Sequence, residues 1–227
     1  MSKVRHFKSL LDINKKEFLR IIDRSIQLKR ESLEGIANTS LSNKTMAMIF
    51  KKNSTRTRVA FETAMARMGG HAIFLTSDST QISRGEELSD TAKVLSGMVD
   101  IIMVRTHDHK EIEELAENSS VPVINGLTEK FHPCQLLADM QTYFEEKGSI
   151  EGKKVAWVGD GCNMCNSYIN AAKVLNFNLK IATPSGFEPD QVTLDLAKDN
   201  VELCDMPGKA VEDCDLVTTD VWSSMGD

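Results

Sequence analysis

Short apolar runs alternate with amphipathic segments along most of this chain. In the first part the apolar runs lack strict polar alternation, which is typical of strands buried on both faces of a parallel sheet. The segments between them repeat apolar residues every three to four positions, as surface helices do. We expect strands at 45–50, 71–75, 100–104 and 121–125, and helices at 14–32, 54–68, 86–98, 109–118 and 133–147.

A polar, glycine-containing segment, 145–154, separates this series from a second one. The second series predicts strands at 154–160, 179–183 and 216–220, with helices at 164–176 and 189–199. We therefore predict an α/β protein of two doubly wound parallel-sheet domains, at 1–148 and 149–227. Because the second series stops just after a strand, we expect its sheet to be incomplete at the C-terminus.

Three of the predicted helices carry an apolar stripe that marks the side expected to be buried. In the first helix the stripe is Phe18, Ile22 and Ile26. In the helix that follows the first strand it is Phe61, Ala64, Met65 and Met68. In the helix at 133–147 it is Leu136, Met140 and Phe144.

Composition narrows the class of protein. The 227 residues are 41% hydrophobic and 26% charged, which are ordinary values for a globular protein. The net charge of −6 argues against a general binder of nucleic acid or membrane surfaces. No apolar run approaches the roughly 18 residues that span a bilayer, and the N-terminus lacks a signal-peptide pattern. The odd number of cysteines, five, fits free thiols in a reducing compartment, so we expect a cytoplasmic protein.

The start of the helix after the first strand poses an electrostatic problem. Ser54 is a good N-cap, yet Arg56 and Arg58 stand in the first turn, where the helix dipole disfavours positive charge. Guanidinium groups beside free backbone N–H groups and the hydroxyls of Thr55 and Thr57 would form a phosphate site. The alternative is a capped surface helix with solvated arginines.

Two further strand ends carry polar side chains that could face the same edge of the sheet. Arg105 ends the third strand, where it could bind an anion or form a surface ion pair. His132 precedes Pro133 at the start of the helix at 133–147, and Gln135 follows one turn later. An imidazole can donate to a developing oxyanion, and an amide can accept from a substrate NH₂. Alternatively, His132 serves only as a helix cap.

Other motifs are weaker. The segment "VGDGCNMCNS" is similar to a dinucleotide fingerprint, but Met164 replaces its third glycine, and no acid ends the next strand. Cys162 and Cys165 form a C-x-x-C without a second pair for zinc. The run 107–109, His-Asp-His, is better explained by a solvated turn than by a metal site. We therefore expect neither a nicotinamide cofactor nor a metal.

The combination of S-T-R-T-R at 54–58, V-R-T at 104–106 and H-P-C-Q at 132–135 resembles the aspartate/ornithine carbamoyltransferase family. The resemblance implies a site for carbamoyl phosphate. In it Arg56 and Thr57 hold the phosphate, Arg105 bridges phosphate and carbonyl, and His132 polarises the carbonyl oxygen with Thr57. The resemblance also implies phosphate contacts from Ser54 and Thr55, a carbamoyl NH₂ contact from Gln135, and a supporting position for Arg58. The implied catalytic residues are Arg56, Thr57, Arg105 and His132.

The segment "DVWSSMG" at 220–226 resembles the D-x-x-x-S-M-G motif of the ornithine branch of that family. It implies that Asp220, assisted by Ser224, binds the substrate's α-ammonium group. Asn163 and the backbone at Met225 would bind its carboxylate. If Asp220 were only a strand-end cap, the S-M-G match would be a coincidence.

The segment at 78–91 also resembles the family, whose members use this loop to reach a neighbouring subunit's site. Gln81 stands where the aspartate branch has a lysine, and by resemblance it belongs to the carbamoyl phosphate site. A site shared between subunits implies an oligomer, and the family's catalytic unit is a homotrimer.

By resemblance, the reaction transfers the carbamoyl group of carbamoyl phosphate to the δ-amine of L-ornithine, giving L-citrulline and phosphate in arginine metabolism. It needs no metal or organic cofactor. Family members continue past S-M-G, so we expect these 227 residues to recognise carbamoyl phosphate and to turn over poorly. Three alternatives remain open. They are another amine acceptor, such as putrescine or an acylated ornithine; a non-catalytic phosphometabolite-binding module; and a dinucleotide oxidoreductase.

Overall fold

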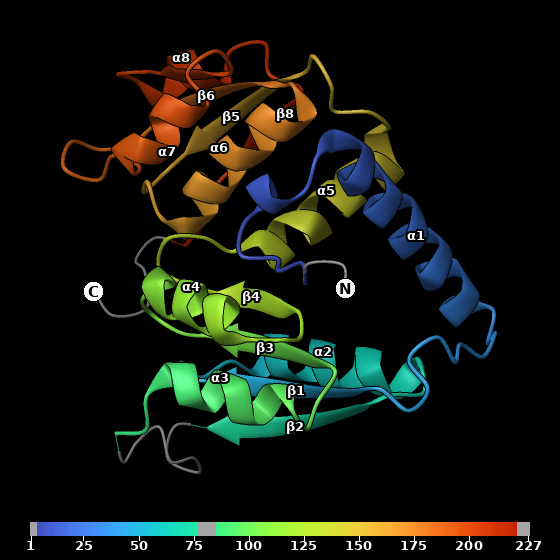
Figure 1. Cartoon of the computed structure of the whole chain (residues 1–227). Helices are drawn as coiled ribbons and strands as arrows, with labels where there is room; N and C mark the ends of the chain where they lie inside the picture. Colours follow the sequence, from blue (N-terminus) through green and yellow to red (C-terminus); the bar gives the residue numbers. More distant parts are fainter. Residues whose placement is uncertain (1–3, 77–84, 222–227) are drawn as a thin grey trace. The chain divides into compact units, whose positions relative to one another are not determined.

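The computed structural model describes residues 4–76 and 85–221 (Figure 1). The chain forms two compact units, one comprising residues up to 8 with residues 23–129, the other residues 9–22 with residues from 130 onward. Each unit contains a four-stranded parallel sheet flanked by helices. The predicted α/β fold with two doubly wound parallel sheets is therefore confirmed. Among the described residues, no helix is both long and apolar enough to cross a membrane.

The first unit contains the four strands predicted for the first part of the chain. They are β1 (Thr45–Phe50), β2 (His71–Thr76), β3 (Ile101–Arg105) and β4 (Val123–Leu127), in the sheet order β2-β1-β3-β4. The segment before the first helix also lies along this sheet, because the N–H of Phe7 donates to the carbonyl of Val123 at 2.8 Å. This addition at the β4 edge was not predicted from the sequence.

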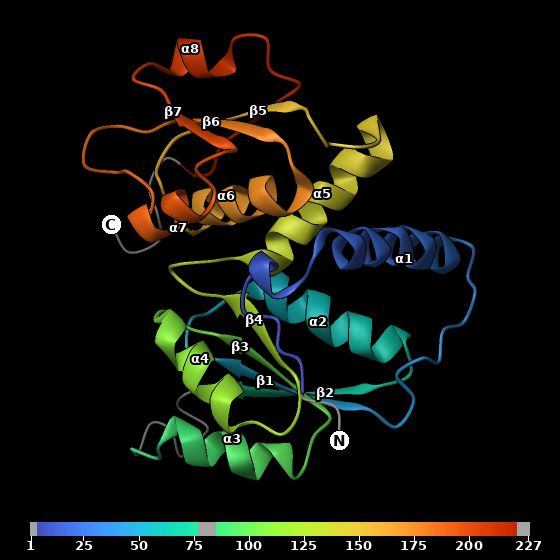
Figure 2. The ribbon, with the colours of Figure 1, turned by 45° about the horizontal axis from the view of Figure 1, so that its top comes forward.

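Helices cover both faces of the first sheet (Figure 2). They are α2 (Thr55–Arg67) on one face, and α3 (Leu88–Ser96) and α4 (His109–Asn118), which pack against each other, on the other. Successive β1 side chains alternate between these layers: Ala47 and Ile49 pack on the α3–α4 side, and Met48 on the α2 side. This two-sided burial explains why the strand is a continuous apolar run.

The buried face of α2 is narrower than the predicted stripe. Met65 is fully buried, Phe61 and Met68 are half-buried, and Ala64 is exposed. The long side chain of Met65 reaches the sheet, whereas the short side chain of Ala64 lies beside the line of contact.

The other two predicted stripes also differ slightly from the structure. On the helix at 133–147, Tyr143 is buried in place of Phe144, which is half-buried. In the first helix Ile26 is half-buried, whereas Phe18 and Ile22 are buried as predicted.

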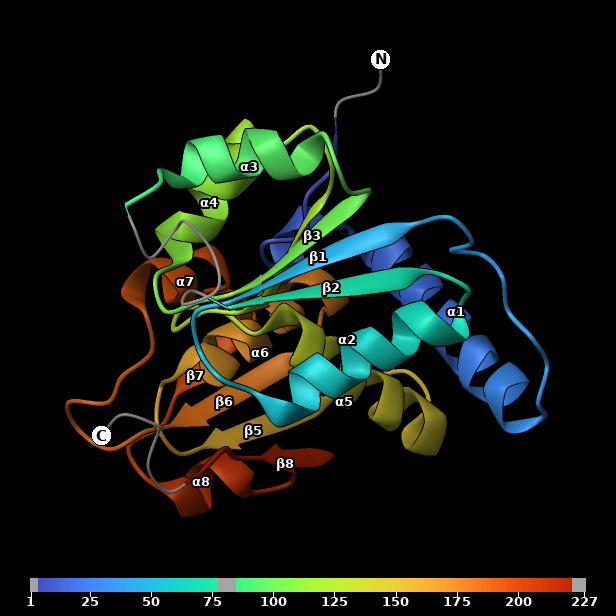
Figure 3. The same ribbon diagram turned by 90° about the horizontal axis from the view of Figure 1, so that it is seen from below.

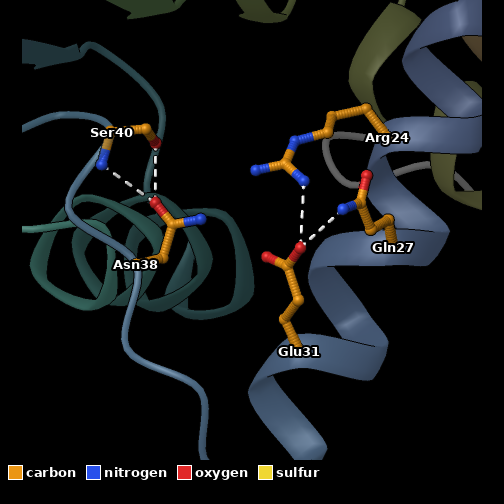
Figure 4. A network of polar contacts seen from close by, with 5 residues as sticks. All are labelled: Arg24, Gln27, Glu31, Asn38 and Ser40. Carbon is orange, nitrogen blue, oxygen red and sulfur yellow. Dashed lines mark hydrogen bonds and ion pairs between the residues drawn. The ribbon is translucent and has the colours of Figure 1, made fainter.

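The helix α1 (Lys15–Leu33) follows a short 3₁₀ turn, η1 (Leu10–Asp12). In its later turns Glu31 accepts hydrogen bonds from Gln27 at 2.7 Å and from Arg24 at 3.2 Å (Figure 4). Beyond the helix, the side chain of Asn38 accepts from the backbone N–H and the hydroxyl of Ser40, which fixes a tight turn. These exposed contacts define where the helix ends and the chain turns toward β1.

The second unit has strands β5 (Lys154–Val158), β6 (Asn178–Ala182), β7 (Val201–Leu203) and β8 (Leu216–Thr218), in the order β7-β6-β5-β8. Its longer helices are α5 (Pro133–Lys147) and α6 (Asn163–Leu175), and its shorter ones α7 (Gln191–Leu196) and α8 (Pro207–Val211). The sequence did not predict β7 and α8, because each is short and carries few buried residues.

The second sheet is also covered on both faces (Figures 2 and 3). On one face Ala156 and Ala182 pack against Ala210 of α8, and small residues allow this short helix to lie close to the strands. On the other face Trp157 packs on Tyr168 of α6, with ring centroids 5.6 Å apart. Both the large and the small residues of β5 are therefore part of a core.

The strand orders place a topological switch point in each sheet. The chain goes from β1 to β2 on one side and then to β3 on the other, and it goes from β5 to β6 and later to β8. Ligands of open α/β sheets bind where the strand order reverses, outside the carboxyl ends of the strands. The segments to examine are those that follow β1 and β3 in one unit, and β5 and β8 in the other.

The close approach of two loops in the second unit generates a testable prediction. A Cβ at Gly161 would lie 2.3 Å from the nitrogen of Pro189 and 2.5 Å from the carbonyl carbon of Glu188. Gly161→Ala should therefore lower the free energy of unfolding in urea by about 1–3 kcal/mol, because the backbone must move apart. Gly208→Ala is the matched control, since no atom of the described residues lies within 4 Å of its Cβ position in α8. Equal unfolding midpoints for the two variants would contradict the prediction.

Candidate active site

Helix α2 begins at the switch point of the first sheet. Ser54 is its N-cap with extended backbone (φ −162°, ψ 122°), and its Oγ accepts the N–H of Thr57 at 3.3 Å. The first turn of α2 contains no acidic residue. The remaining N–H groups of this turn, with the dipole behind them, make a positively polarised surface.

The two arginines of this turn have different surroundings. Arg58 donates from Nε to Oε1 of Glu62 at 2.9 Å, and its guanidinium lies 3.6 Å from the centre of the Phe74 ring. Its charge is thus balanced by an acid and an aromatic face. Arg56 is exposed, and within residues 4–76 and 85–221 no hydrogen bond or ion pair engages it. The unbalanced charge at the start of α2 belongs to Arg56.

Arg105 lies at the carboxyl end of β3, directly opposite Phe50 of β1 in the sheet register. Its side chain is buried, with 4% of the residue exposed, and its Nη1 donates to Oγ1 of Thr57 at 3.3 Å. Burial lowers the pKa of the guanidinium, and its Nε has no hydrogen-bond partner in the described part of the chain. The structure therefore does not support the alternative of a surface ion pair.

One acid near this strand end, Glu111, is already engaged. Glu111 of α4 pairs with Nζ of Lys51 at 2.8 Å and accepts a short hydrogen bond from the hydroxyl of Thr106. The N–H of Lys51 in turn donates to the carbonyl of Arg105 at 2.8 Å. These contacts join the ends of β1 and β3. Within the described part of the chain they leave the buried guanidinium with the neutral hydroxyl of Thr57 as its side-chain partner.

In the second unit, His132 caps the start of α5 through its backbone. Its N–H donates to Oγ of Ser167 at 2.8 Å, and the same hydroxyl donates to the carbonyl of Asn163 at 2.7 Å. Its side chain makes no capping hydrogen bond, so the alternative role of the imidazole as a helix cap is not supported. Pro133 occupies the first turn as predicted.

Gln135 is exposed on the first turn of α5 and donates from Nε2 to Oδ1 of Asp139 at 2.9 Å. The other carboxylate oxygen of Asp139 accepts the hydroxyl of Tyr168 at 3.3 Å. Burial raises the pKa of Asp139, the two hydrogen bonds oppose this effect, and the charge of Asp220 adds to it. Nothing in the sequence singles out Asp139, since an acid in the middle of a helix is common.

The carboxyl ends of β5 and β8 meet at the switch point of the second sheet. Cys162, the N-cap of α6, donates from its thiol to Oδ2 of Asp220 at a sulfur–oxygen distance of 3.5 Å. Burial is the main effect that raises the pKa of Cys162, and the charge of Asp220 contributes. Asn163, the next residue, starts α6, so this contact brings the start of α6 to Asp220. The sequence offered one signal for Cys162, its place between the strand and Asn163.

Three predicted site residues, Gln81, Ser224 and Met225, lie outside the described residues. Their roles stay predictions.

The motifs that we judged weaker have local explanations. Gly161 allows its backbone to approach residues 187–189, and its N–H donates to the carbonyl of Phe187 at 2.8 Å. His107 pairs with Glu129 at 2.7 Å, whereas His109 contacts the hydroxyl of Thr128 at 3.1 Å. Within the described residues, no group of three or more His, Cys, Asp or Glu side chains is arranged to hold a metal.

Comparison with known proteins agrees with these strand-end motifs. The family model for the aspartate/ornithine carbamoyltransferase carbamoyl-P binding domain matches residues 5–145, and the model for the Asp/Orn binding domain matches residues 151–227. The chain belongs to the aspartate/ornithine carbamoyltransferase family. The predicted boundary after residue 148 stays a prediction.

Individual relatives give the same result. The ornithine carbamoyltransferase of Hydrogenovibrio crunogenus is 52% identical over 98% of this chain and 74% of its own length. An anabolic ornithine carbamoyltransferase of Pseudomonas savastanoi pv. phaseolicola is 51% identical over 98% of this chain and 72% of its own. The structure of ornithine carbamoyltransferase from Pyrococcus furiosus superposes with a TM-score of 0.93 at 46% identity, covering 98% of this chain and 73% of that one. The chain spans about three quarters of the length of these relatives.

The different surroundings of the two first-turn arginines predict different effects of removing them. Arg56→Gln should weaken binding of inorganic phosphate by about 10- to 100-fold, the usual range for one charge-assisted hydrogen bond. Arg58→Gln should change phosphate affinity far less, because its guanidinium already contacts Glu62 and Phe74. Isothermal titration calorimetry with inorganic phosphate measures both. Equal losses in the two variants would contradict the assignment.

Proposed function

We propose that this protein transfers the carbamoyl group of carbamoyl phosphate to the δ-amine of L-ornithine, giving L-citrulline and phosphate. The observation that carries the proposal is the buried Arg105, whose Nη1 contacts Thr57 and whose Nε has no partner in the described part of the chain. Family membership and relatives named ornithine carbamoyltransferase support the choice of substrates.

The phosphate site is assigned to the start of α2. Ser54, Thr55 and Thr57 provide hydroxyl and backbone donors, and Arg56 provides a charge that no described residue neutralises. The helix N-terminus favours a doubly charged oxygen cluster over a neutral ligand. Gln81 is assigned to the same substrate by resemblance to the family.

The carbonyl of the donor is assigned to three hydrogen-bond donors, Arg105, His132 and Thr57. As the amine attacks, negative charge accumulates on this oxygen, and hydrogen-bond donors directed at it stabilise that charge. Gln135 is assigned to the carbamoyl NH₂, for which it offers a carbonyl oxygen. Loss of one oxyanion donor typically lowers kcat by about 10²–10³.

The acceptor is assigned to the switch point of the second unit. Asp220 binds the α-ammonium group together with Ser224, and Asn163 with the backbone of Met225 binds the carboxylate. The position of Cys162 beside Asp220 supports this assignment, because it brings the start of α6 to that carboxylate. An acceptor without an α-ammonium group would leave Asp220 unpaired.

In the reaction the lone pair of the neutral δ-amine forms a C–N bond to the carbamoyl carbon, and the C–O bond to phosphate breaks. The departing phosphate takes the proton that the amine loses. Holding both substrates in contact supplies orientation worth about 7–11 kcal/mol of the barrier. Every bond made or broken belongs to the two substrates.

By the same resemblance we propose a homotrimer with sites shared between subunits, working in the cytoplasm in arginine synthesis. One relative is named an anabolic ornithine carbamoyltransferase, which favours synthesis over breakdown.

The choice of acceptor is tested by the product. Citrulline should form from L-ornithine at least tenfold faster than the corresponding carbamoylated products form from putrescine or N-acetylornithine, about the discrimination expected for one lost charged contact. His132→Ala should lower citrulline formation by about 10²–10³. Colorimetric assay at high protein concentration measures both rates. Equal rates for the three amines would reject ornithine as the acceptor.

The protonation state of the acceptor predicts the pH dependence. A free aliphatic amine has a pKa of about 10, so its reactive neutral fraction grows about tenfold for each pH unit in the neutral range. The rate of citrulline formation at subsaturating ornithine should therefore rise from pH 6 to pH 9. A flat profile over this range would contradict attack by a neutral amine.

A further inference from the structure

The amide of Gln135 has two ends of nearly equal shape, one a hydrogen-bond acceptor and the other a donor. In the structure the NH₂ end faces Asp139, four residues later on the same helix, with 2.9 Å between Nε2 and Oδ1. An ionised carboxylate can only accept hydrogen bonds. Asp139 therefore selects one of the two amide orientations, the one that leaves the carbonyl oxygen of Gln135 available.

Asp139 is itself held in place from the core of the second unit. Its Oδ2 accepts the hydroxyl of Tyr168, a residue only 3% exposed, whose ring packs on Trp157. The Tyr168 oxygen also accepts the hydroxyl of Thr218 at 3.5 Å, at the end of β8. The carboxylate thus has a second contact, to α6, that does not involve the exposed Gln135.

We infer that Asp139 is a positioning residue that holds the Gln135 amide with its carbonyl oxygen toward the substrate, so that the site selects a carbamoyl group over an acyl group. This inference rests on the proposed function. A carbamoyl group presents an NH₂ donor where acetyl phosphate presents a methyl group. The fixed carbonyl oxygen of Gln135 accepts a hydrogen bond from the carbamoyl NH₂. The methyl group of acetyl phosphate offers it no donor.

The consequence is a discrimination between two donors of similar size and charge. With the amide fixed, carbamoyl phosphate gains a hydrogen bond that acetyl phosphate cannot form, worth about 10- to 100-fold in affinity. With the amide free to rotate, its NH₂ can turn toward the substrate. There it cannot form a hydrogen bond with the carbamoyl NH₂, which is also a donor, whereas it can lie beside the methyl group of acetyl phosphate. The two affinities then converge, and the affinity for inorganic phosphate does not change.

The chain offers a matched control for the Gln–Asp pair. On α7 Gln191 donates to Asp195, also four residues later, at 2.8 Å. Asp195→Asn replaces the carboxylate that accepts the Gln191 hydrogen bond, as Asp139→Asn does for Gln135, but at a position to which no ligand is assigned. It should alter neither donor selectivity nor phosphate affinity.

The experiment compares wild type, Asp139→Asn, Gln135→Ala, the double variant and Asp195→Asn. Affinities for freshly prepared carbamoyl phosphate, acetyl phosphate and inorganic phosphate are measured by calorimetry on the full chain. Asp139→Asn should reduce the carbamoyl-to-acetyl ratio to near unity with phosphate affinity retained. It should have no further effect in the Gln135→Ala background, because it acts only through that amide.

Three results would overturn the inference. The first is an equal loss of affinity for all three ligands in Asp139→Asn. The second is a carbamoyl-to-acetyl affinity ratio that this variant leaves unchanged. The third is additive effects of the two substitutions in the double variant. Tyr168→Phe, which removes one anchor of the carboxylate, serves if Asp139→Asn does not fold, and it should lower the ratio by a smaller factor. If wild type binds carbamoyl phosphate no better than inorganic phosphate, the proposed function fails as well. If wild type prefers carbamoyl phosphate to acetyl phosphate and Asp139→Asn keeps this preference, only the inference is rejected.

Discussion

The constraint from which the rest of the site follows is a buried guanidinium that has no carboxylate partner among residues 4–76 and 85–221. Removing the charge of Arg105 from water is costly, and among the described residues its side-chain partner is the neutral hydroxyl of Thr57. Glu111 is engaged by Lys51 and Thr106, and α2 points its positive end toward the same side of the sheet. The end of β3 and the start of α2 therefore gather positive charge, and a phosphate has the charge and the acceptors to balance it.

The second unit has the same kind of switch point, but the charged group there is negative. Its switch point collects the carboxylate of Asp220 and the thiol of Cys162, and the charge of Asp220 also affects the pKa of Asp139. A negative site suits an ammonium group, as the positive one suits a phosphate. The two switch points thus differ in the charge that they present, which agrees with the proposed anionic donor and cationic acceptor.

Much of this architecture could be predicted from the sequence, because buried parallel strands are uninterrupted apolar runs. β1 has the predicted bounds, and the predicted segment at 109–118 is α4. β7 and α8 were missed because their residues are few and largely exposed. The position of Arg105 at a strand end singled it out, whereas Asp220 was singled out by the resemblance of residues 220–226 to a family motif, and both roles stay predictions. Contacts between residues far apart in sequence, such as Arg58 with Phe74 and Cys162 with Asp220, leave no periodic signal and needed the structure.

The central claim is that the buried charge of Arg105 exists to meet an anion. It is tested most directly by thermal unfolding of wild type and Arg105→Met with and without inorganic phosphate. A ligand that binds the folded state raises the melting temperature, and replacing an unpaired buried charge by an apolar side chain of similar volume does not destabilise the fold. The account predicts that phosphate raises the Tm of wild type and not of Arg105→Met, and that without phosphate the variant is at least as stable. Equal stabilisation of both proteins by phosphate would contradict it.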